Sequence, residues 1–169
     1  MLNIFKVQGS FKLSKLLISL AITLGAGVIG SLFSMNANDL YLSLNLPSFA
    51  PPAYTFGVVW TFLFIIMGIA FYRIWMYYKE DDCKQNDIVR DALMYFMVQL
   101  IFNILWSVLF FGLFLKTAAL FDIVILLFYI IFTTIKFYKI DKTAAYMMIP
   151  YILWVAFATI LNMSIIFLN

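Results

Sequence analysis

The sequence contains no histidine and one cysteine, Cys83. The missing histidines exclude imidazole as a general base and as a metal ligand. A single cysteine excludes an intrachain disulfide and a CxxC metal motif. The chain also lacks a GxSxG motif, a phosphate-binding loop and paired carboxylates at catalytic spacing. The sequence therefore predicts no catalytic residue, no metal site and no required cofactor.

Charged residues are scarce as well. Asp, Glu, Lys and Arg make up 11% of the 169 residues, whereas hydrophobic residues make up 66%. A soluble domain is typically about 25% charged and about 45–50% apolar. By length the chain is one domain, residues 1–169, and a domain of this size cannot bury so much apolar surface. The remaining apolar surface must face lipid, so we expect an integral multi-pass membrane protein. Because the net charge is only +3, we expect no nucleic-acid partner.

Five stretches are long and apolar enough to cross a bilayer, which takes about 20 residues for a helix. They do not alternate in polarity as transmembrane strands would, so the predicted fold is all-α, a bundle of five transmembrane helices. A cleaved signal peptide is the alternative for the first stretch, but that stretch is long for one. The predicted spans are residues 16–34, 56–78, 92–114, 117–137 and 143–168.

The distribution of positive charge predicts the orientation of these spans. Of the 11 lysines and arginines, only Lys116 falls on the other side of the predicted spans from the rest. The positive-inside rule then puts the N-terminus in the cytoplasm and the C-terminal Asn169 outside.

The longest predicted loop, residues 35–55, connects the first two spans. It holds three of the four prolines in the sequence, namely Pro47, Pro51 and Pro52. Proline fixes φ and removes a backbone donor, so the loop is predicted to form a rigid, extended cover over the second span.

Polar residues inside a span are costly and therefore informative. Asn103, Trp106 and Ser107 have the i, i+3, i+4 spacing that places them on one helix face. That face predicts either hydrogen bonding between helices or the wall of a ligand pocket, and the spacing alone slightly favours the first. Asp122, near the start of the fourth span, is expected to pair with Lys116 in preference to relaying protons.

The fifth span combines a proline with a repeating face. Pro150, Trp154 and Ala158 recur every four residues. Proline bends a membrane helix, and Trp154 presents a flat aromatic surface beside a small residue, a pattern most often due to packing. In the first span, Ala21/Gly25 and Ala26/Gly30 form small-xxx-small pairs, which are typical of a helix contact face.

Several segments share a signature in their order along the chain. The loop and second span read YLSLNLPSFAPP from Tyr41 and FGVVWT from Phe56, and the third span reads NILWS from Asn103. ALFD follows from Ala119, and the fifth span reads PYILWVAFATILN from Pro150. Together these segments resemble the TspO family, also called the translocator protein or peripheral-type benzodiazepine receptor family, over nearly the whole chain.

The resemblance implies a five-helix bundle, commonly a homodimer, with a pocket that opens toward the side of the first loop. Members of the family bind porphyrins and other tetrapyrroles, benzodiazepine-type compounds and, in some cases, cholesterol. The resemblance favours the pocket interpretation of the Asn103 face. By position, the implied ligand-binding residues are Tyr41, Phe49, Pro51, Asn103, Trp106, Ser107, Trp154 and Ala158.

The predicted function is therefore a membrane receptor for porphyrins and similar flat apolar ligands in a bacterial plasma membrane. Phe49, Trp106 and Trp154 would stack on the ligand, while Asn103 and Ser107 would hydrogen-bond to a polar group. Transport of tetrapyrroles or sterols and light-dependent porphyrin degradation are the alternatives. The family usually has Trp at the position of Phe49, which puts degradation in doubt. Histidine is a common axial ligand of haem iron, and the sequence has none. We therefore expect metal-free porphyrin to bind at least as well as haem.

Overall fold

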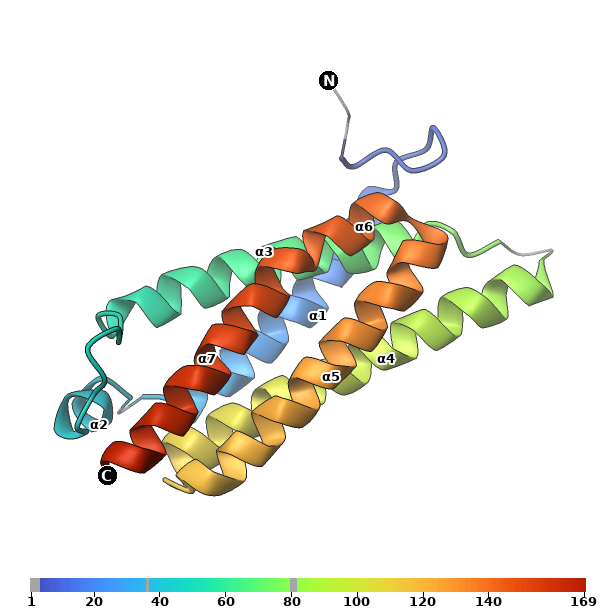
Figure 1. Ribbon diagram of the computed structural model, residues 1–169. Coiled ribbons are helices and arrows are strands. Elements are labelled where there is room, and N and C mark those ends of the chain that lie inside the picture. The colour runs from blue at the N-terminus through green and yellow to red at the C-terminus, as the bar shows by residue number, and fades with distance from the viewer. Residues whose placement is uncertain (1–3, 36, 80–81) are drawn as a thin grey trace.

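A computed structural model describes residues 4–35, 37–79 and 82–169, which are largely helical (Figure 1). No β-strand occurs among these residues, although Val7 and Ser10 form an isolated bridge. The long helices run side by side, and the short helix α2 lies at the same end of the bundle as the C-terminus (Figure 1). The elements are α1 (Leu13–Leu32), α2 (Ala37–Ser43), α3 (Tyr54–Trp75), α4 (Cys83–Ser107), the π-helical turn η1 (Val108–Gly112), α5 (Lys116–Ile140), α6 (Lys142–Met147) and α7 (Ile149–Leu168).

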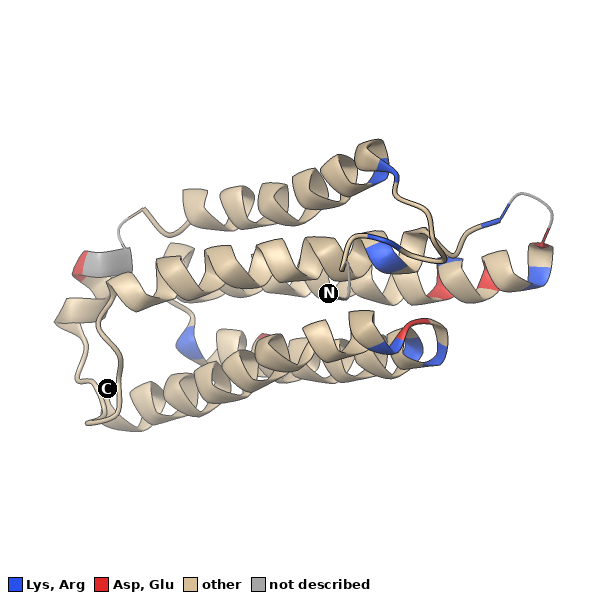
Figure 2. Ribbon diagram, turned by 90° about the horizontal axis from the view of Figure 1, so that it is seen from above, with Lys and Arg blue, Asp and Glu red and all other residues tan. Residues whose placement is uncertain are grey.

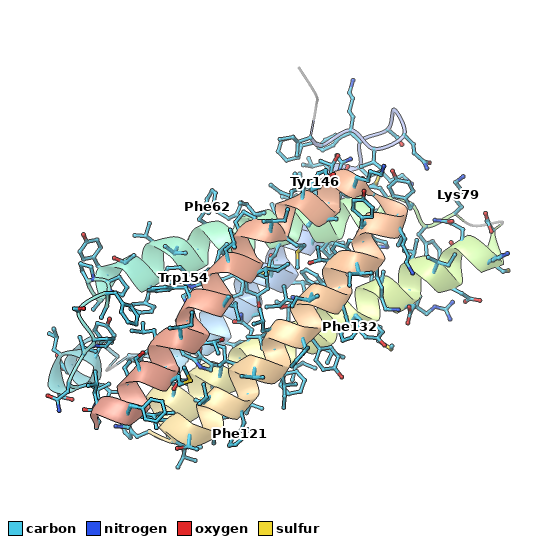
Figure 3. The ribbon with its side chains drawn as sticks, in the orientation of Figure 1. Phe62, Lys79, Phe121, Phe132, Tyr146 and Trp154 are labelled. Carbon is cyan, nitrogen blue, oxygen red and sulfur yellow. The ribbon has the colours of Figure 1, made fainter. Side chains whose placement is uncertain are left out.

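The prediction of an all-α fold with five spans is confirmed. Five helical stretches, Leu13–Leu32, Tyr54–Trp75, Cys83–Gly112, Lys116–Ile140 and Lys142–Leu168, are long and apolar enough to cross a membrane. No more than 33% of the most apolar window of each is buried within the protein. Large aromatic side chains such as Phe62, Phe121 and Phe132 extend outward from the bundle (Figure 3). Since these outer surfaces are apolar, the chain is an integral multi-pass membrane protein.

Helix α4 begins nine residues before the predicted third span, because the sequence there carries a helix N-cap. The carboxylate of Asp82 accepts a hydrogen bond from the backbone N–H of Gln85 at 3.0 Å. Such a cap satisfies one of the free N–H groups at a helix start. Residues 83–91, which are mostly polar and lie outside the predicted spans, are therefore the first turns of a helix that extends beyond the apolar span.

The cover predicted between the first two spans is only partly extended. Helix α2 occupies its first part, which corrects the prediction, and residues 44–53 follow without regular helix except for a turn from Pro47 to Ala50. The hydroxyl of Tyr41 in α2 donates a hydrogen bond to the Pro51 carbonyl at 2.9 Å. This bond ties α2 to the proline-rich segment. Burial raises the pKa of the Tyr41 phenol, so the donor stays protonated at neutral pH.

Most of the charged residues gather at the end of the bundle that carries the N-terminus (Figure 2). There Arg73 of α3 forms an ion pair with Asp141, which lies between α5 and α6, at 2.7 Å, and both side chains are almost fully buried. The other oxygen of Asp141 accepts the backbone N–H of Thr143 at 2.8 Å and so caps α6. Burial, followed by the negative charge of Asp141, raises the pKa of the neighbouring Tyr77.

The proline of the fifth span marks a break between two helices. Pro150 stands in the first turn of α7, just after α6 ends at Met147. Proline is tolerated in the first turn because its missing N–H has no helical partner there. The predicted bend is therefore a boundary, with α6 and α7 together forming one spanning stretch.

Candidate functional site

A cavity of about 650 Å³ lies in the half of the bundle that carries α2. Its walls come from the second half of α1, the first half of α3 and the last turns of α4, with α2 and η1 contributing at the end. Ligand pockets usually measure about 300–1,000 Å³ and are largely apolar with a few polar groups. The lining residues are Leu24, Gly27, Val28, Gly30, Ser31, Ser34, Met35, Tyr41, Ala53, Tyr54, Phe56, Gly57, Trp60, Thr61, Phe64, Asn103, Trp106, Ser107 and Phe111.

Close helix contacts close the inner end of this cavity. A Cβ on Gly68 of α3 would lie 3.2 Å from the backbone Cα of Leu20 on α1, so the two helices touch there. One turn further along, a Cβ on Gly27 would lie 2.6 Å from the ring of Phe64. By contrast, a Cβ on Gly57 would meet nothing within 4 Å. Helices α1 and α3 are therefore in contact at mid-bundle and leave room between them toward α2.

Aromatic rings form two walls of the cavity. On α3, Trp60 stacks on Phe64 with ring centroids 5.6 Å apart and 29° between the planes. On α4, Trp106 stacks on Phe110 at 5.1 Å and 17°. The π-helical turn adds a residue to the helix, and Phe111, the next residue, packs edge-on against Trp106 and also lines the cavity. The turn thus brings neighbouring aromatic residues onto the inner side of the bundle.

Asn103 connects the cavity to the buried core. Its side-chain amide donates a hydrogen bond to the Tyr151 hydroxyl at 2.8 Å, and that hydroxyl donates to the Gln99 side chain at 2.7 Å. All three residues are buried. Asn103 therefore joins α4 to α7 by a hydrogen bond between helices and also lines the cavity, whereas ligand binding at this face stays a prediction. The indole N–H of Trp106, one turn along, is buried and has no hydrogen-bond partner among the described residues.

The predicted site residues do not all meet at this cavity. Tyr41, Asn103, Trp106 and Ser107 line it. Ala158 lines a second, very small cavity of about 10 Å³, together with Tyr41 and Trp106. The carbonyl of Pro51 holds the Tyr41 hydroxyl.

Phe49 and Trp154 line neither of these two cavities. Phe49 is exposed and packs edge-on against Phe157, with ring centroids 6.2 Å apart. Trp154 lies on α7 where it faces α3 (Figure 3), 5.8 Å from the ring of Phe56. Because Phe56 lines the cavity, Trp154 supports its wall from behind.

The expected pair between Asp122 and Lys116 is wrong. Asp122 is 4% exposed, and neither of its carboxylate oxygens has a hydrogen-bond partner among the described residues. It lies on the inner face of α5 with Ala119, Ile123 and Leu126. Lys116, at the start of the helix, makes no ion pair within the described chain. The separation of six positions puts the two side chains on different sides of the helix.

The residues that α1 and α3 contribute to the cavity lining were not predicted from the sequence. Leu24, Val28 and Ser31 have helical i, i+4, i+7 spacing, and Phe56, Trp60 and Phe64 recur every four residues. Both sets line the cavity. The periodicity marked a helix face in each case, but a span of almost uniform hydrophobicity gives no sign of whether that face meets lipid, another helix or a cavity.

Comparison with known proteins gives consistent matches over most of the chain. The TspO/MBR family model matches residues 18–168. A tryptophan-rich protein TspO of Chlorobaculum tepidum is 36% identical over 162 residues, covering 93% of this chain and 99% of that protein. One of Archaeoglobus fulgidus is 35% identical over 156 residues, covering 92% and 97%. The translocator protein of Homo sapiens is 33% identical over 122 residues, covering 72% and 70%.

Proposed function

The chain belongs to the TspO/MBR family, and from this premise we propose that it is a membrane receptor that binds porphyrins and similar flat, apolar ligands in the cavity between α1, α3 and α4. Benzodiazepine-type compounds belong to the same class of ligand. The proposal includes a homodimer in a bacterial plasma membrane, with the N-terminus in the cytoplasm. The clustering of positive charge at the N-terminal end supports this orientation (Figure 2).

The proposal rests on the volume of the cavity together with the aromatic and polar side chains that line it. A cavity of about 650 Å³ has Trp60 and Trp106 in its walls and the side chains of Asn103 and Ser107 beside them. An indole face offers offset or edge-to-face contact to a flat aromatic ligand. The amide and hydroxyl provide a hydrogen-bonding position for one polar substituent of the ligand.

Spectral titration of the purified protein with protoporphyrin tests the proposal. Trp60→Ala should weaken binding about tenfold, because it removes one ring contact together with apolar area. Trp75→Ala is the matched control, since Trp75 lies on the same helix but outside the cavity lining. Saturable binding that both variants weaken equally, or no binding by the parent protein, would contradict the proposal.

A second titration compares protoporphyrin with haem. Among the described residues that line the cavity, only Met35 and the tyrosines could coordinate iron, and both are weaker axial ligands than histidine in this role. We expect metal-free porphyrin to bind at least as tightly as haem. A shifted Soret band with much tighter binding of haem would contradict this prediction.

A further inference from the structure

The cavity has an open side, and that side lies along two spanning helices. On α1 the exposed lining residues Leu24, Val28 and Ser31 follow one helix face, and the exposed lining residue Met35 lies in the turn after the helix. On α3 the exposed lining residues Tyr54, Gly57 and Thr61 have i, i+3, i+7 spacing, which is also one face. The remaining lining residues on α3 and α4, such as Trp60 and Trp106, are half-buried or buried.

These two faces form the edges of a slit. From Tyr54 to Thr61 a helix rises about 10 Å, so the slit follows α3 for at least this length. It ends inward where Gly27 meets Phe64, and α1 and α3 touch beyond this point at Gly68. At the edge itself, Gly57 has no side chain and nothing within 4 Å of where one would begin.

We infer that this slit, residues 28–35 of the chain facing residues 54–61, opens into the bilayer and that the cavity takes its ligand from the membrane. Val28 is 60% exposed and Met35 80% exposed, and both edges belong to stretches long and apolar enough to span a membrane or directly follow one. Apolar side chains exposed on a spanning helix face lipid. The ligand is therefore a compound that dissolves in the bilayer, with an apolar body and a polar group for Asn103 and Ser107.

The inference about loading rests on the proposed function, whereas the opening to lipid can be tested without a ligand. The probe for the opening is phosphatidylcholine with brominated acyl chains, which quenches tryptophan fluorescence on contact. A protein that keeps only Trp60 should be quenched strongly in such vesicles. A protein that keeps only Trp106, which is 5% exposed, should be quenched far less. Equal, weak quenching of both would overturn the open slit.

The kinetic test uses two glycines that both have open space. Gly57→Leu puts a branched side chain at the edge of the slit, and Gly25→Leu puts the same side chain on α1 outside the cavity lining. A narrowed entrance slows entry and exit alike. For protoporphyrin supplied in vesicles, Gly57→Leu should lower the association and dissociation rates each by about tenfold. Gly25→Leu should leave both rates at the parental values.

The results of these experiments distinguish a failure of the proposed function from a failure of ligand entry through the slit. If the parent protein binds no protoporphyrin, the proposed function fails, and the quenching of Trp60 still decides whether the slit opens to lipid. If the parent binds and Gly57→Leu leaves both rates unchanged, entry through the slit is overturned while the proposed function stands. If Gly57→Leu raises Kd without slowing dissociation, Gly57 is part of the binding surface and the slit is not the route of entry.

Discussion

At the scale of single residues, glycine decides how closely α1 approaches its neighbours. A Cβ on Gly68 would lie 2.7 Å from the Thr23 hydroxyl and 3.2 Å from the Leu20 Cα. A Cβ on Gly30 would lie 3.2 Å from the Ser107 hydroxyl. The prediction of a helix contact face therefore holds at Gly30 of the pair Ala26/Gly30, whereas a Cβ on Gly25, of the pair Ala21/Gly25, would meet nothing within 4 Å.

This difference predicts opposite effects for the same substitution. Gly68→Ala should lower the free energy of unfolding by about 1–3 kcal/mol, because the backbone of α1 must shift to make room. Gly25→Ala should leave stability the same or raise it slightly, since glycine in a helix interior is unfavourable. Titration of the purified proteins with a denaturing detergent measures both. Equal stability of the two variants would show that α1 does not pack at Gly68 as described.

At the scale of elements, Asp141 connects three helices at the end that carries the N-terminus. It accepts hydrogen bonds from Arg73 of α3 and from the first turn of α6, directly after α5 ends. Both partners of the ion pair are almost fully buried. Removal of one partner of a buried pair leaves the other charge without compensation, which costs far more than the loss of an exposed pair.

Asp141→Asn should therefore destabilise the protein by about 3 kcal/mol. Asparagine is also a good N-cap, so the cap of α6 remains and the loss reports the ion pair. Asp87→Asn is the control, because Asp87 and Arg90 form an exposed pair at 3.8 Å and exposed pairs contribute little. Thermal unfolding in detergent compares the variants. An equally small shift for both substitutions would contradict the role given to Asp141.

The elements also show what the sequence could and could not predict. All five spans could be predicted from long apolar runs, because length and hydropathy alone identify a helix that can cross a bilayer. Helix α2 and the first turns of α4 were missed because a polar helix outside the membrane depends on its caps and contacts, such as the Asp82 cap and the bond from Tyr41 to Pro51.

Among the residues that line the cavity, Asn103, Trp106 and Ser107 could be identified from the sequence as candidates, because polar side chains on one helix face stand out in an apolar span. Trp60 was missed because aromatic residues are common along the whole chain, at 20%. The positions of Phe49 and Trp154 outside the cavity depend on how α3 and α7 pack, which periodicity does not encode.

At the scale of the whole molecule, the two ends of the bundle differ in charge. Helix α5 begins with Lys116 at the end of the bundle that carries α2 (Figure 1), and the other lysines and arginines gather at or near the opposite end (Figure 2). Such a difference orients a membrane protein with its basic end in the cytoplasm. In that orientation the cavity lies in the outer half of the membrane, and the slit between α1 and α3 would open to the outer leaflet.

The chain carries its own reporter for this orientation, because its single cysteine, Cys83, is exposed at the basic end. In intact cells a membrane-impermeant maleimide should leave Cys83 unlabelled until the cells are permeabilised. In a Cys83→Ser protein, Ser48→Cys places a thiol at an exposed position near α2, and this thiol should be labelled without permeabilisation. The reverse pattern would invert the molecule, and the cavity would then receive ligands from the cytoplasmic leaflet. Since the slit lies between residues 28–35 and residues 54–61 whichever way the molecule is oriented, inversion would change the source of the ligand but not its lateral route of entry.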